Sequence, residues 1–518
     1  MKIKDRCGKL KILDYEKRTT KSNMEDKDIV KIFLETQEWQ TFECKRAAIK
    51  PADLLETVVG FANADGGFIV VGLEDPAKAQ GEKRLLGISE NPDNVSDFLR
   101  LIDKEIDPPF ILWGKFEIDI TNVQGQADKL LVLNIKKSND VHSLKRGDTF
   151  VRKGRQNVKI GSTEIMRLKY EKGAIKFESE KSGVTSLENL DHGLLAKYKK
   201  DTSSTGLDDW QFLKDNGLAV GGNGKYELTK AGLLLFGSNP SVALTSKCGI
   251  KVSHYYGTKP TYTGKPNFVT RPFTIEGPLM KQIEQAIEYF REIVKSSPPK
   301  LSGASFNPTF LIPEWAFQEA ITNAVIHRNY FVQDDIQVRF FDDRVEIESP
   351  GTYPGHITVE NIRAERFARN PLILRTLNRF QAAPNLDIGE GVDRMFKIMK
   401  EQNLYEPLFY PPTLRPNTVL LLLLNMHKIE YWDTVKKYLD ENFKITNREA
   451  RAITGISDTI KMSRLLKDWV GKGLLEKNHS KFKGGVFYKK VGATLPRGLD
   501  KAFAMGIENG KSNHHFSH

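Results

Sequence analysis

The chain has 518 residues, of which 39% are hydrophobic and 28% charged, and its formal net charge is +12 at pH 7. This length is too great for one hydrophobic core and predicts several domains, and the composition is that of a globular rather than a disordered protein. The positive charge favours a polyanionic partner, nucleic acid before a membrane surface, although solubility alone would also account for it.

The three cysteines, Cys7, Cys44 and Cys248, are too far apart for a zinc-binding spacing or a disulfide framework. The opening MKIKDRCGKLKILDYEKR lacks the apolar core of a signal peptide. The longest apolar run, VLLLLL at 419–424, is too short to span a bilayer. We therefore expect a soluble, cytoplasmic protein with no membrane partner.

The N-terminal part of the chain alternates between helical and strand periodicities. Residues 1–28 are polar and basic and predict a loosely ordered arm, and residues 29–169 predict a mixed α and β domain. Its expected helices cover 29–36, 52–64 and about 94–105, and its expected strands cover 40–45, 66–75, 115–121 and 129–136. The domain closes with DTFVRKGRQNVKI, a strand and turn rich in arginine and lysine, and residues 170–192 predict a linker.

The rest of the chain predicts three further units and a disordered tail. Residues 193–240 give helix, helix, hairpin and helix, which resembles a small winged-helix element. Residues 241–427 form a second α/β unit, and residues 428–492 give helices followed by a basic hairpin. Strands of the second unit are expected at 249–256, 335–341, 344–349 and 417–425, and the tail covers 493–518. The expected fold class is therefore multidomain α+β.

Two carboxylates and a lysine lie on or beside the strand in EWQTFECKRA. Glu43 and Lys45 alternate with Phe42 and Cys44, as in a half-buried strand, and Glu38 converges on Glu43 only if it sits in a bend before the strand. Glu74 and Asp75 end the next buried strand. Converging carboxylates repel unless a cation lies between them, so the group predicts a divalent metal, Mg2+ or Mn2+, with Lys45 facing a phosphodiester. The alternative is a solvated strand edge followed by an ordinary turn at Asp75.

The order Glu38-x4-Glu43-x-Lys45, followed by VVGFANADGGFIVVGLED, resembles the Schlafen-type, AlbA-like domain over about residues 29–165. The resemblance implies binding of RNA or DNA. In nucleolytic Schlafens, two glutamates and an aspartate form a metal-dependent RNase site, which implies metal-binding and catalytic roles for Glu38, Glu43 and Asp75, with Lys45 beside them. Many bacterial relatives are described as DNA-binding instead, and Glu74 competes with Asp75 as the third acid.

A basic segment near the end of this domain predicts contacts with the nucleic-acid backbone. Arginines on a strand and its turn suit phosphate through bidentate geometry, and a solvated rim is the alternative. The residues concerned are Lys145, Arg146, Arg152, Lys153 and Arg155.

WAFQEAITNAVIHRNY predicts an amphipathic helix on which Glu319, Asn323 and His327 stack along one face. A carboxylate one turn before an amide suits the polarisation of a water beside a Mg2+ that the amide oxygen and phosphates hold. An ordinary polar stripe is the alternative. Downstream, DDRVEIESPGTYPG reads as a strand entering a Gly-Pro loop, and DIGEGVDRMFKIMK as a glycine turn whose backbone amides can cradle phosphate.

Together these segments resemble the ATP-binding domain of the gyrase, Hsp90, histidine kinase and MutL superfamily, and more closely its variant in bacterial proteins labelled RecG-like helicases or transcriptional regulators. The resemblance implies ATP as a ligand and places His327 on the ATP-site helix. Glu319 would be the general base and Asn323 the Mg2+ ligand. Gly351 would lie in the adenine-side loop, and Gly389 and Gly391 in the phosphate lid. The superfamily's adenine-binding aspartate is missing and Ser349 stands near its place, and no Walker loop supports a helicase.

The C-terminal unit reads as a helix-turn-helix with a basic wing. Thr446 and Glu449 predict a capping box, Gly455 a turn and Ser457 a helix cap. Ile460, Leu465, Leu466 and Trp469 are expected in the core. The expected nucleic-acid contacts are Thr459, Lys461, Arg464, Lys467, Lys481 and Lys483. Use of the same unit for protein contact or dimerisation is the alternative.

The leading hypothesis is a nucleic-acid-acting protein that binds and cleaves RNA or DNA with a divalent metal, under the control of an ATP-binding unit. We expect at least a homodimer, and such two-module chains are associated with stress or phage defence. The alternative is a non-catalytic DNA-binding transcriptional regulator with ATP as ligand or with none. A histidine kinase ranks last, because no separate phosphoacceptor helix is present.

Overall fold

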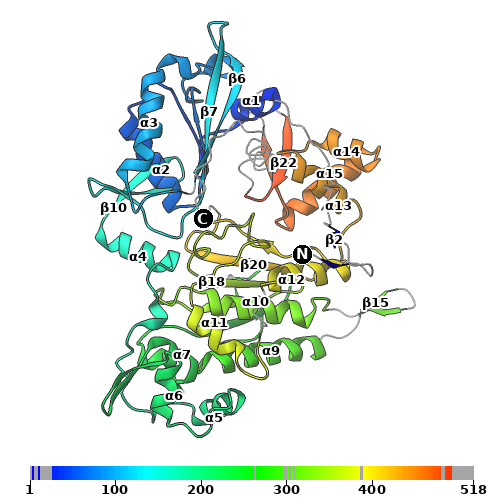
Figure 1. Cartoon of the computed structure of the whole chain (residues 1–518). Helices are drawn as coiled ribbons and strands as arrows, with labels where there is room; N and C mark the ends of the chain where they lie inside the picture. The colour runs from blue at the N-terminus through cyan, green and yellow to red at the C-terminus, as the bar shows by residue number, and fades with distance from the viewer. Residues whose placement is uncertain are drawn as a thin grey trace.

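The computed structural model describes residues 26–111, 113–261, 264–296, 310–384, 389–412, 414–479 and 485–492, together with the backbone of four short strands outside these ranges. Helices and several sheets alternate along the chain in a multidomain α+β fold, as predicted. Figure 1 shows the central sheet with its helices in the middle of the molecule, the N-terminal domain above it, and the C-terminal helices at the right. The predicted tail and most of the predicted arm, together with Lys481 and Lys483, lie outside the described residues.

The N-terminal domain is built on a four-stranded sheet in the order β3-β4-β7-β6, in which only β3 and β4 are parallel. The strands are β3 (Phe42–Lys45), β4 (Gly67–Val71), β6 (Trp113–Thr121) and β7 (Ala127–Ile135). Helices α2 (Pro51–Asn63) and α3 (Pro92–Glu105) pack on one face of the sheet, and α1 (Asp26–Glu35) packs on the other. In β4, Ile69 and Val71 pack in the core beneath α2 and α3, whereas Phe68 and Val70 pack in the core on the side of α1. The strand is therefore buried on both faces, which explains its unbroken apolar run.

The basic segment forms a hairpin of β9 (Thr149–Lys153) and β10 (Gln156–Ile160). The hairpin lies against α2, where Asn157 Nδ2 donates to Thr57 Oγ1 at 2.9 Å. Short strands β5 (Ile106–Asp107) and β8 (Ser143–Leu144) pair beside it, and α4 (Ser162–Lys172) leaves the domain.

The predicted linker is packed onto the central unit. The Glu178 carboxylate accepts from the amides of Leu372 and Ile373 at 2.9 and 2.8 Å, at the start of α11 (Pro371–Asn378). The next segment shows the predicted order of two helices, a hairpin and a helix. Its elements are α5 (His192–Asp201), α6 (Asp209–Asp215), β11 (Ala219–Gly222), β12 (Lys225–Leu228), α7 (Lys230–Phe236) and the short α8 (Pro240–Ala243).

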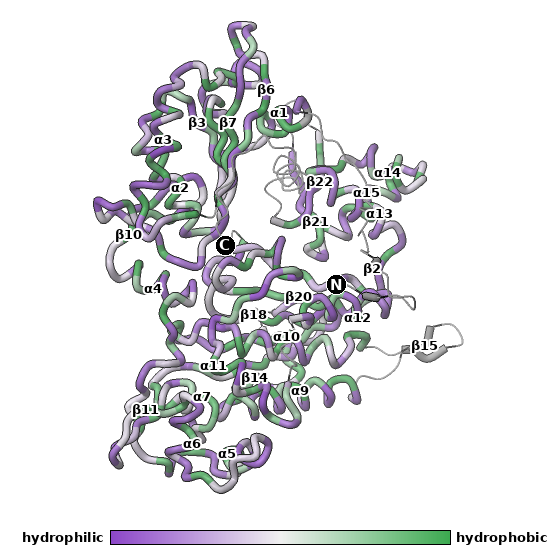
Figure 2. The backbone as a smooth tube through the Cα atoms, viewed as in Figure 1, coloured by the Kyte–Doolittle hydropathy of each residue, from purple (hydrophilic) through white to green (hydrophobic). Residues whose placement is uncertain are grey.

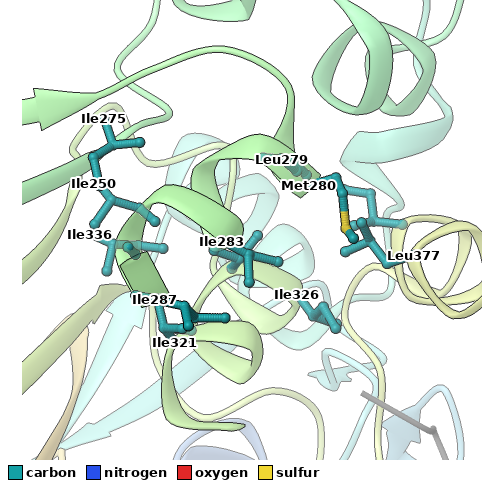
Figure 3. Packing of buried hydrophobic residues seen from close by; sticks show 14 of the residues in the cluster. Ile250, Ile275, Leu279, Met280, Ile283, Ile287, Ile321, Ile326, Ile336 and Leu377 are labelled. Carbon is teal, nitrogen blue, oxygen red and sulfur yellow. The ribbon is translucent and has the colours of Figure 1, made fainter. Parts of the chain in front are cut away.

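This segment and the central unit share one hydrophobic core, which extends from Leu190 to Leu423. Figure 3 shows Met280 of α9 (Leu279–Ser296) beside Leu377 of α11 within that core. The segment is therefore joined to the central unit by buried contacts and not only by the chain.

The central unit is a six-stranded sheet in the order β14-β13-β17-β18-β20-β19. Its strands are β13 (Ile250–Tyr255), β14 (Phe268–Ile275), β17 (Ile336–Phe340), β18 (Arg344–Pro350), β19 (Leu408–Phe409) and β20 (Thr418–Leu424). Helices α9, α10 (Glu314–His327) and α12 (Gly391–Glu401) cover one face through the shared core. On the opposite face, Arg339 Nη1 lies 2.8 Å from Glu348 and 3.6 Å from Glu346. Strand β14 was not predicted.

The C-terminal unit follows the predicted order of helices and a hairpin: α13 (Trp432–Glu441), α14 (Asn447–Thr454), α15 (Thr459–Gly471), β21 (Leu475–His479) and β22 (Val486–Lys490). The capping box of Thr446 and Glu449 is confirmed, and Gly455 ends α14 with a φ of 73°. Ser457 does not cap α15; the Asp458 carboxylate accepts from the amides of Ile460 and Lys461 instead. An ion pair between Lys444 and Glu35 joins this unit to α1.

Figure 2 shows hydrophobic stretches along the central sheet and hydrophilic ones on the outer helices. Within the described part of the chain, no helix combines the length and the apolar character that crossing a bilayer requires.

Candidate functional site

The acidic group of Glu38, Glu43 and Asp75 lies around the start of β3 and the end of β4. Glu38 precedes the strand in a bend, and its carboxylate accepts from the Cys44 amide at 3.1 Å. Lys45 Nζ lies 3.8 Å from Glu38 Oε1 and forms an ion pair with Glu43 as well. The bend therefore brings the two glutamates together around one lysine, which is the condition that the spacing set for their convergence.

Glu43 is buried, with 3% of its surface exposed, because the β9–β10 hairpin covers this end of β3. Its second partner is Arg152, which forms a buried ion pair with Glu43 and also donates to the Trp39 carbonyl at 3.0 Å. The predicted phosphate contact of Arg152 is thus wrong: its side chain is inside the domain, where a buried carboxylate requires a cation. The solvated-edge interpretation of Glu43 is wrong for the same reason.

Of the two acids that follow β4, Asp75 adds to the negative charge felt by Glu38 and Glu74 does not. Burial raises the pKa of Glu38, and the charges of Glu43 and Asp75 add to this, against the opposing effects of Lys45 and the Cys44 amide. Asp75 is half-buried and accepts from the Ala77 amide at 2.8 Å. Glu74 faces Arg46, at 3.5 Å. Asp75 is therefore within electrostatic reach of Glu38.

In this arrangement the acidic group fits an ammonium better than a metal ion. Lys45 holds the place between Glu38 and Glu43 that a divalent cation would need. No group of three histidine, cysteine or acidic side chains in the described ranges is arranged to hold a metal ion. Two cationic partners, Lys45 and Arg152, already neutralise Glu43.

The other basic residues of the hairpin region are exposed. Arg146 is paired with Glu56 at 2.6 Å and with Asp148 at 2.7 Å. Arg155 donates to the Glu38 carbonyl at 3.1 Å, which places its guanidinium beside the acidic group. Lys145 and Lys153 form no ion pair with a described carboxylate. Lys145, Lys153 and Arg155 thus remain candidates for contact with nucleic acid.

A cavity of about 500 Å³ opens between α10, the loop after β18 and the start of α12. This volume lies in the range of about 300–1,000 Å³ that is typical of small-molecule sites. Its lining includes six of the seven predicted ligand-binding residues, namely Glu319, Asn323, His327, Ser349, Gly389 and Gly391. The seventh, Gly351, does not line the cavity. Its φ is +100° and a Cβ there would lie 2.5 Å from the Asn329 Cβ, so glycine is needed for the backbone to pass close to Asn329.

Glu319 and Asn323 form the polar centre of the cavity. Asn323 Nδ2 donates to Glu319 Oε1 at 2.9 Å, and Glu319 is 6% exposed. Burial raises the pKa of Glu319, against the opposing effects of the Asn323 hydrogen bond and the Arg394 charge. A Cβ at Gly391 would lie 1.7 Å from Glu319 Oε1, so the carboxylate rests directly on the first residue of α12. A buried carboxylate of raised pKa beside a helix N-terminus has the properties of a general base at a phosphate site.

The opposite end of the cavity is apolar and contains Ser349. Its hydroxyl donates to the Ala324 carbonyl at 3.0 Å, and Ile347, Val419 and Leu421 line the wall beside it. His327 Nδ1 has no hydrogen-bond partner within the described structure, and burial together with the charge of Arg369 lowers the pKa of His327 to about 4. His327 is therefore a neutral wall residue at physiological pH.

Sequence reasoning missed two arginines at the mouth of the cavity. Arg394, in the first turn of α12, stacks over Trp315 with its guanidinium carbon 4.7 Å from the ring centre. Arg366 lies against the glycine turn, since a Cβ at Gly389 would be 1.9 Å from Arg366 Nε. Both side chains are exposed, and neither forms an ion pair with a carboxylate in the described ranges. The sequence did contain a signal for Arg394: an arginine in the first turn of a helix, where the helix dipole favours anions, indicates an anion-binding site.

The exposed face of α15 carries four of the predicted contact residues, Thr459, Lys461, Arg464 and Lys467. The prediction that Ile460 belongs to the core is wrong: Ile460 is 64% exposed, and Met462 is buried instead. The helix begins at Thr459, so Ile460 in its first turn points away from the core that Leu466 and Trp469 complete.

Comparison with sequence families matches three parts of the chain to family models. Residues 38–161 match the Schlafen, AlbA_2 family, and residues 333–420 match a family described as putative ATP-dependent DNA helicase RecG C-terminal. Residues 184–246 match a domain of unknown function, DUF8451. The chain therefore joins a Schlafen-type domain to an ATPase-like domain, as the motifs indicated. The family named after a helicase covers part of the central unit only.

One similar solved structure is the crystal structure of the DIP2311 protein from Corynebacterium diphtheriae. It is 19% identical, covers 90% of this chain and 94% of its own, and gives a TM-score of 0.39. None of the curated proteins compared with the chain matches it.

Proposed function

We propose that the protein binds nucleic acid in a nucleotide-dependent manner, with a nucleoside triphosphate in the cavity and the polymer on the Schlafen-type domain and the C-terminal helices. The observation that carries the nucleotide part is the buried Glu319, bonded to Asn323 and resting on Gly391 at the start of α12. The two domain matches support the combination.

The cavity suits a triphosphate bound with Mg2+. Asn323 donates through Nδ2, and its Oδ1, for which the described residues supply no hydrogen bond, would hold the metal, which would neutralise charge on the phosphates. Arg394 and Arg366 at the mouth would bind phosphate oxygens, for which a guanidinium is well shaped. Glu319 would accept a proton from a water, as its raised pKa allows.

Ser349 offers a way to recognise adenine without the usual aspartate. Its hydroxyl proton is given to the Ala324 carbonyl, which leaves the oxygen lone pairs as acceptors for an exocyclic amino group. We therefore expect ATP to bind more tightly than GTP, which presents a carbonyl at that position.

For the C-terminal unit we propose a winged helix with α15 as its recognition helix. Thr459, Lys461, Arg464 and Lys467 share its exposed face with Ile460. The basic side chains would bind phosphates, and Ile460 would contact a thymine methyl group.

A second candidate function is metal-dependent cleavage of RNA or DNA at the acidic group, in a role such as stress or phage defence. Burial raises the pKa of Glu38, and the added charges of Glu43 and Asp75 favour this candidate because they indicate neighbouring carboxylates. Binding without cleavage ranks first, since Lys45 and Arg152 occupy the oxygens of Glu43 and the group does not fit a metal in this arrangement.

Direct titration of the full chain with a fluorescent ATP analogue and Mg2+ tests the first proposal. We expect binding to the wild type, and Arg394→Ala to weaken it by at least about tenfold, because a charge-assisted hydrogen bond contributes about 1.5–3 kcal/mol. Lys397→Ala is the matched control: Lys397 is exposed on the same helix and is paired with Asp393 at 2.8 Å. Absence of binding to the wild type, or equal loss in both variants, would refute the assignment.

A further inference from the structure

One loop forms a wall of the cavity and also contacts both nucleic-acid-binding units. This loop, residues 351–370, connects β18 to α11 and supplies Tyr353, Ile357 and Phe367 to the cavity lining. The same loop also contacts residues just after β7 and at the end of α4, which belong to the Schlafen-type domain and to the helix that leaves it.

Lys137, two residues beyond β7, holds the first part of this loop. Its buried ammonium donates to the carbonyls of Tyr353 and Ile357 at 2.8 and 3.1 Å. Asn139 Oδ1 lies 3.1 Å from His356 Nδ1, and a Cβ at Gly355 would be 2.6 Å from the same oxygen. The segment 353–357 is thus held by side chains of the Schlafen-type domain from outside and forms the cavity wall on its inner side.

Arg369 ties the end of the loop to two helices. Its Nη1 donates to the His327 carbonyl at the end of α10 at 2.7 Å. Its Nε and Nη2 donate to the Glu171 carbonyl of α4 at 3.2 and 2.9 Å. Arg369 therefore connects the helix that carries Glu319 and Asn323 to the helix that leaves the Schlafen-type domain.

Tyr353 extends the same loop towards the C-terminal unit. Its hydroxyl donates to the Tyr410 carbonyl at 2.9 Å. The Tyr410 hydroxyl in turn lies against Gly473, in the turn after α15, where a Cβ would be 2.2 Å from it. The domain and the unit for which we propose nucleic-acid binding therefore both contact the loop that forms the cavity wall.

The cations of this junction depend on carbonyl oxygens alone. Lys137 and Arg369 are buried, and neither pairs with a carboxylate of the described chain. Burial lowers the pKa of Lys137 to about 8 and that of Arg369 to about 10, which reflects the cost of a buried charge without an acidic partner. Movement of segment 353–357 would remove both acceptors of Lys137 at once. The position of segment 353–357 is therefore tied to the only hydrogen-bond acceptors that Lys137 has among the described residues.

We propose that Lys137 couples nucleotide binding to nucleic-acid binding. Nucleotide in the cavity fixes segment 353–357, which through Lys137 sets the position of the Schlafen-type domain relative to α15. This position in turn determines the affinity of the protein for nucleic acid. The coupling rests on the proposed function and specifies its regulation. Because coupling free energies are reciprocal, nucleic acid must change the affinity for nucleotide by the same factor.

The test compares Lys137→Met with Lys136→Met, an adjacent lysine that is exposed. Fluorescence anisotropy of labelled duplex DNA and single-stranded RNA is measured on the full chain, with and without a saturating non-hydrolysable ATP analogue and Mg2+. We expect the analogue to change the affinity of the wild type and of Lys136→Met by at least about fivefold, the usual lower bound of allosteric coupling. In Lys137→Met the change should fall below about twofold, with the affinity for nucleotide alone retained.

Several results would overturn the coupling. An unchanged nucleic-acid affinity in the wild type, or an equal change in all three proteins, refutes it while nucleotide binding stands. Failure of the wild type to bind the analogue refutes both the coupling and the nucleotide site. Hydrogen exchange of the wild type provides a measurement without any variant: the analogue should slow exchange in 353–357 and in 137–142 together, and slowing in the cavity residues alone would contradict the proposal.

Discussion

Arg152 and Glu43 form a buried ion pair across 109 positions of the chain, so that one member of the acidic group suggested as a metal site is paired inside the domain. The pair gives β3 a structural role in addition to any chemistry. It joins the β9–β10 hairpin to the central sheet of the domain, and it leaves Lys45 as the cation between the two glutamates.

Breaking this pair should destabilise the Schlafen-type domain. Arg152→Met leaves the Glu43 carboxylate buried without its arginine, which typically costs about 3–5 kcal/mol. The double variant Glu43→Leu/Arg152→Met removes both charges and should recover much of that loss. Arg146→Met, which breaks exposed pairs, should cost at most about 1 kcal/mol. Urea unfolding of the full chain checks all three, and an additive effect in the double variant would contradict the pairing.

The buried carboxylate of Glu319 should make the stability of the central unit depend on pH. Its folded-state pKa is raised by burial, so its contribution to stability is complete below the unfolded value of about 4.3 and is lost as pH rises through the folded value. Glu319→Gln can still accept from Asn323 and removes this dependence. We expect the variant to melt about 2 °C or more above the wild type at pH 8, with the difference shrinking towards pH 5. A pH-independent difference in melting temperature would show that ionisation of Glu319 is not its cause.

Two neighbours on α15 should affect DNA binding in different ways. Arg464→Ala should weaken binding by about 1–3 kcal/mol and reduce the salt dependence, because it removes a cation. Ile460→Ala should weaken binding while leaving the salt dependence unchanged, because it removes only apolar contact. Lys437→Ala, an exposed lysine on α13, is the control. Anisotropy titrations at several salt concentrations measure these effects, and equal losses for Lys437→Ala and Arg464→Ala would indicate general charge attraction and not a recognition helix.

The choice between binding and cleavage depends on Asp75. Labelled tRNA, single-stranded DNA and duplex DNA are incubated with the full chain and Mn2+ or Mg2+, with Asp75→Asn and Glu74→Gln in parallel. We expect all three proteins to bind and to leave the polymers intact, because Lys45 occupies the position between the glutamates. Cleavage by the wild type and by Glu74→Gln, with none by Asp75→Asn, would contradict binding without cleavage and support a nuclease that uses Asp75.

Local patterns were sufficient for most elements, because alternation and helical periodicity depend on neighbouring residues. They placed β3, β4, β6, β7 and α15 and gave the capping box at Thr446. The spacing of Glu38 and Glu43 required a bend for the two to converge, and the structure contains that bend. Strand β14 was missed because it is an edge strand with mostly half-buried or exposed side chains and an internal proline, Pro272, so that it shows little alternation.

The remaining errors arise where a contact comes from a distant part of the chain. The burial of Glu43 depends on residues 149–160, and the sequence of β3 contains nothing that predicts that this hairpin covers it. The hydrogen bonds from Lys137 to the carbonyls of Tyr353 and Ile357 likewise join residues that are far apart in the sequence. Ile460 was misplaced for a local reason: the first residue of α15 determines which way its first turn faces, and Asp458, not Ser457, caps that helix.

The core that extends from Leu190 to Leu423 has a practical consequence for dissecting the protein. Residues 184–246 correspond to a sequence family of their own, yet α7 supplies Leu233, Leu234 and Leu235 to an interior completed by helices far downstream. A fragment cut at the end of this family would expose leucines on both sides of the cut and would be expected to aggregate. Expression of the whole span from the end of α4 to the end of β20 preserves that interior.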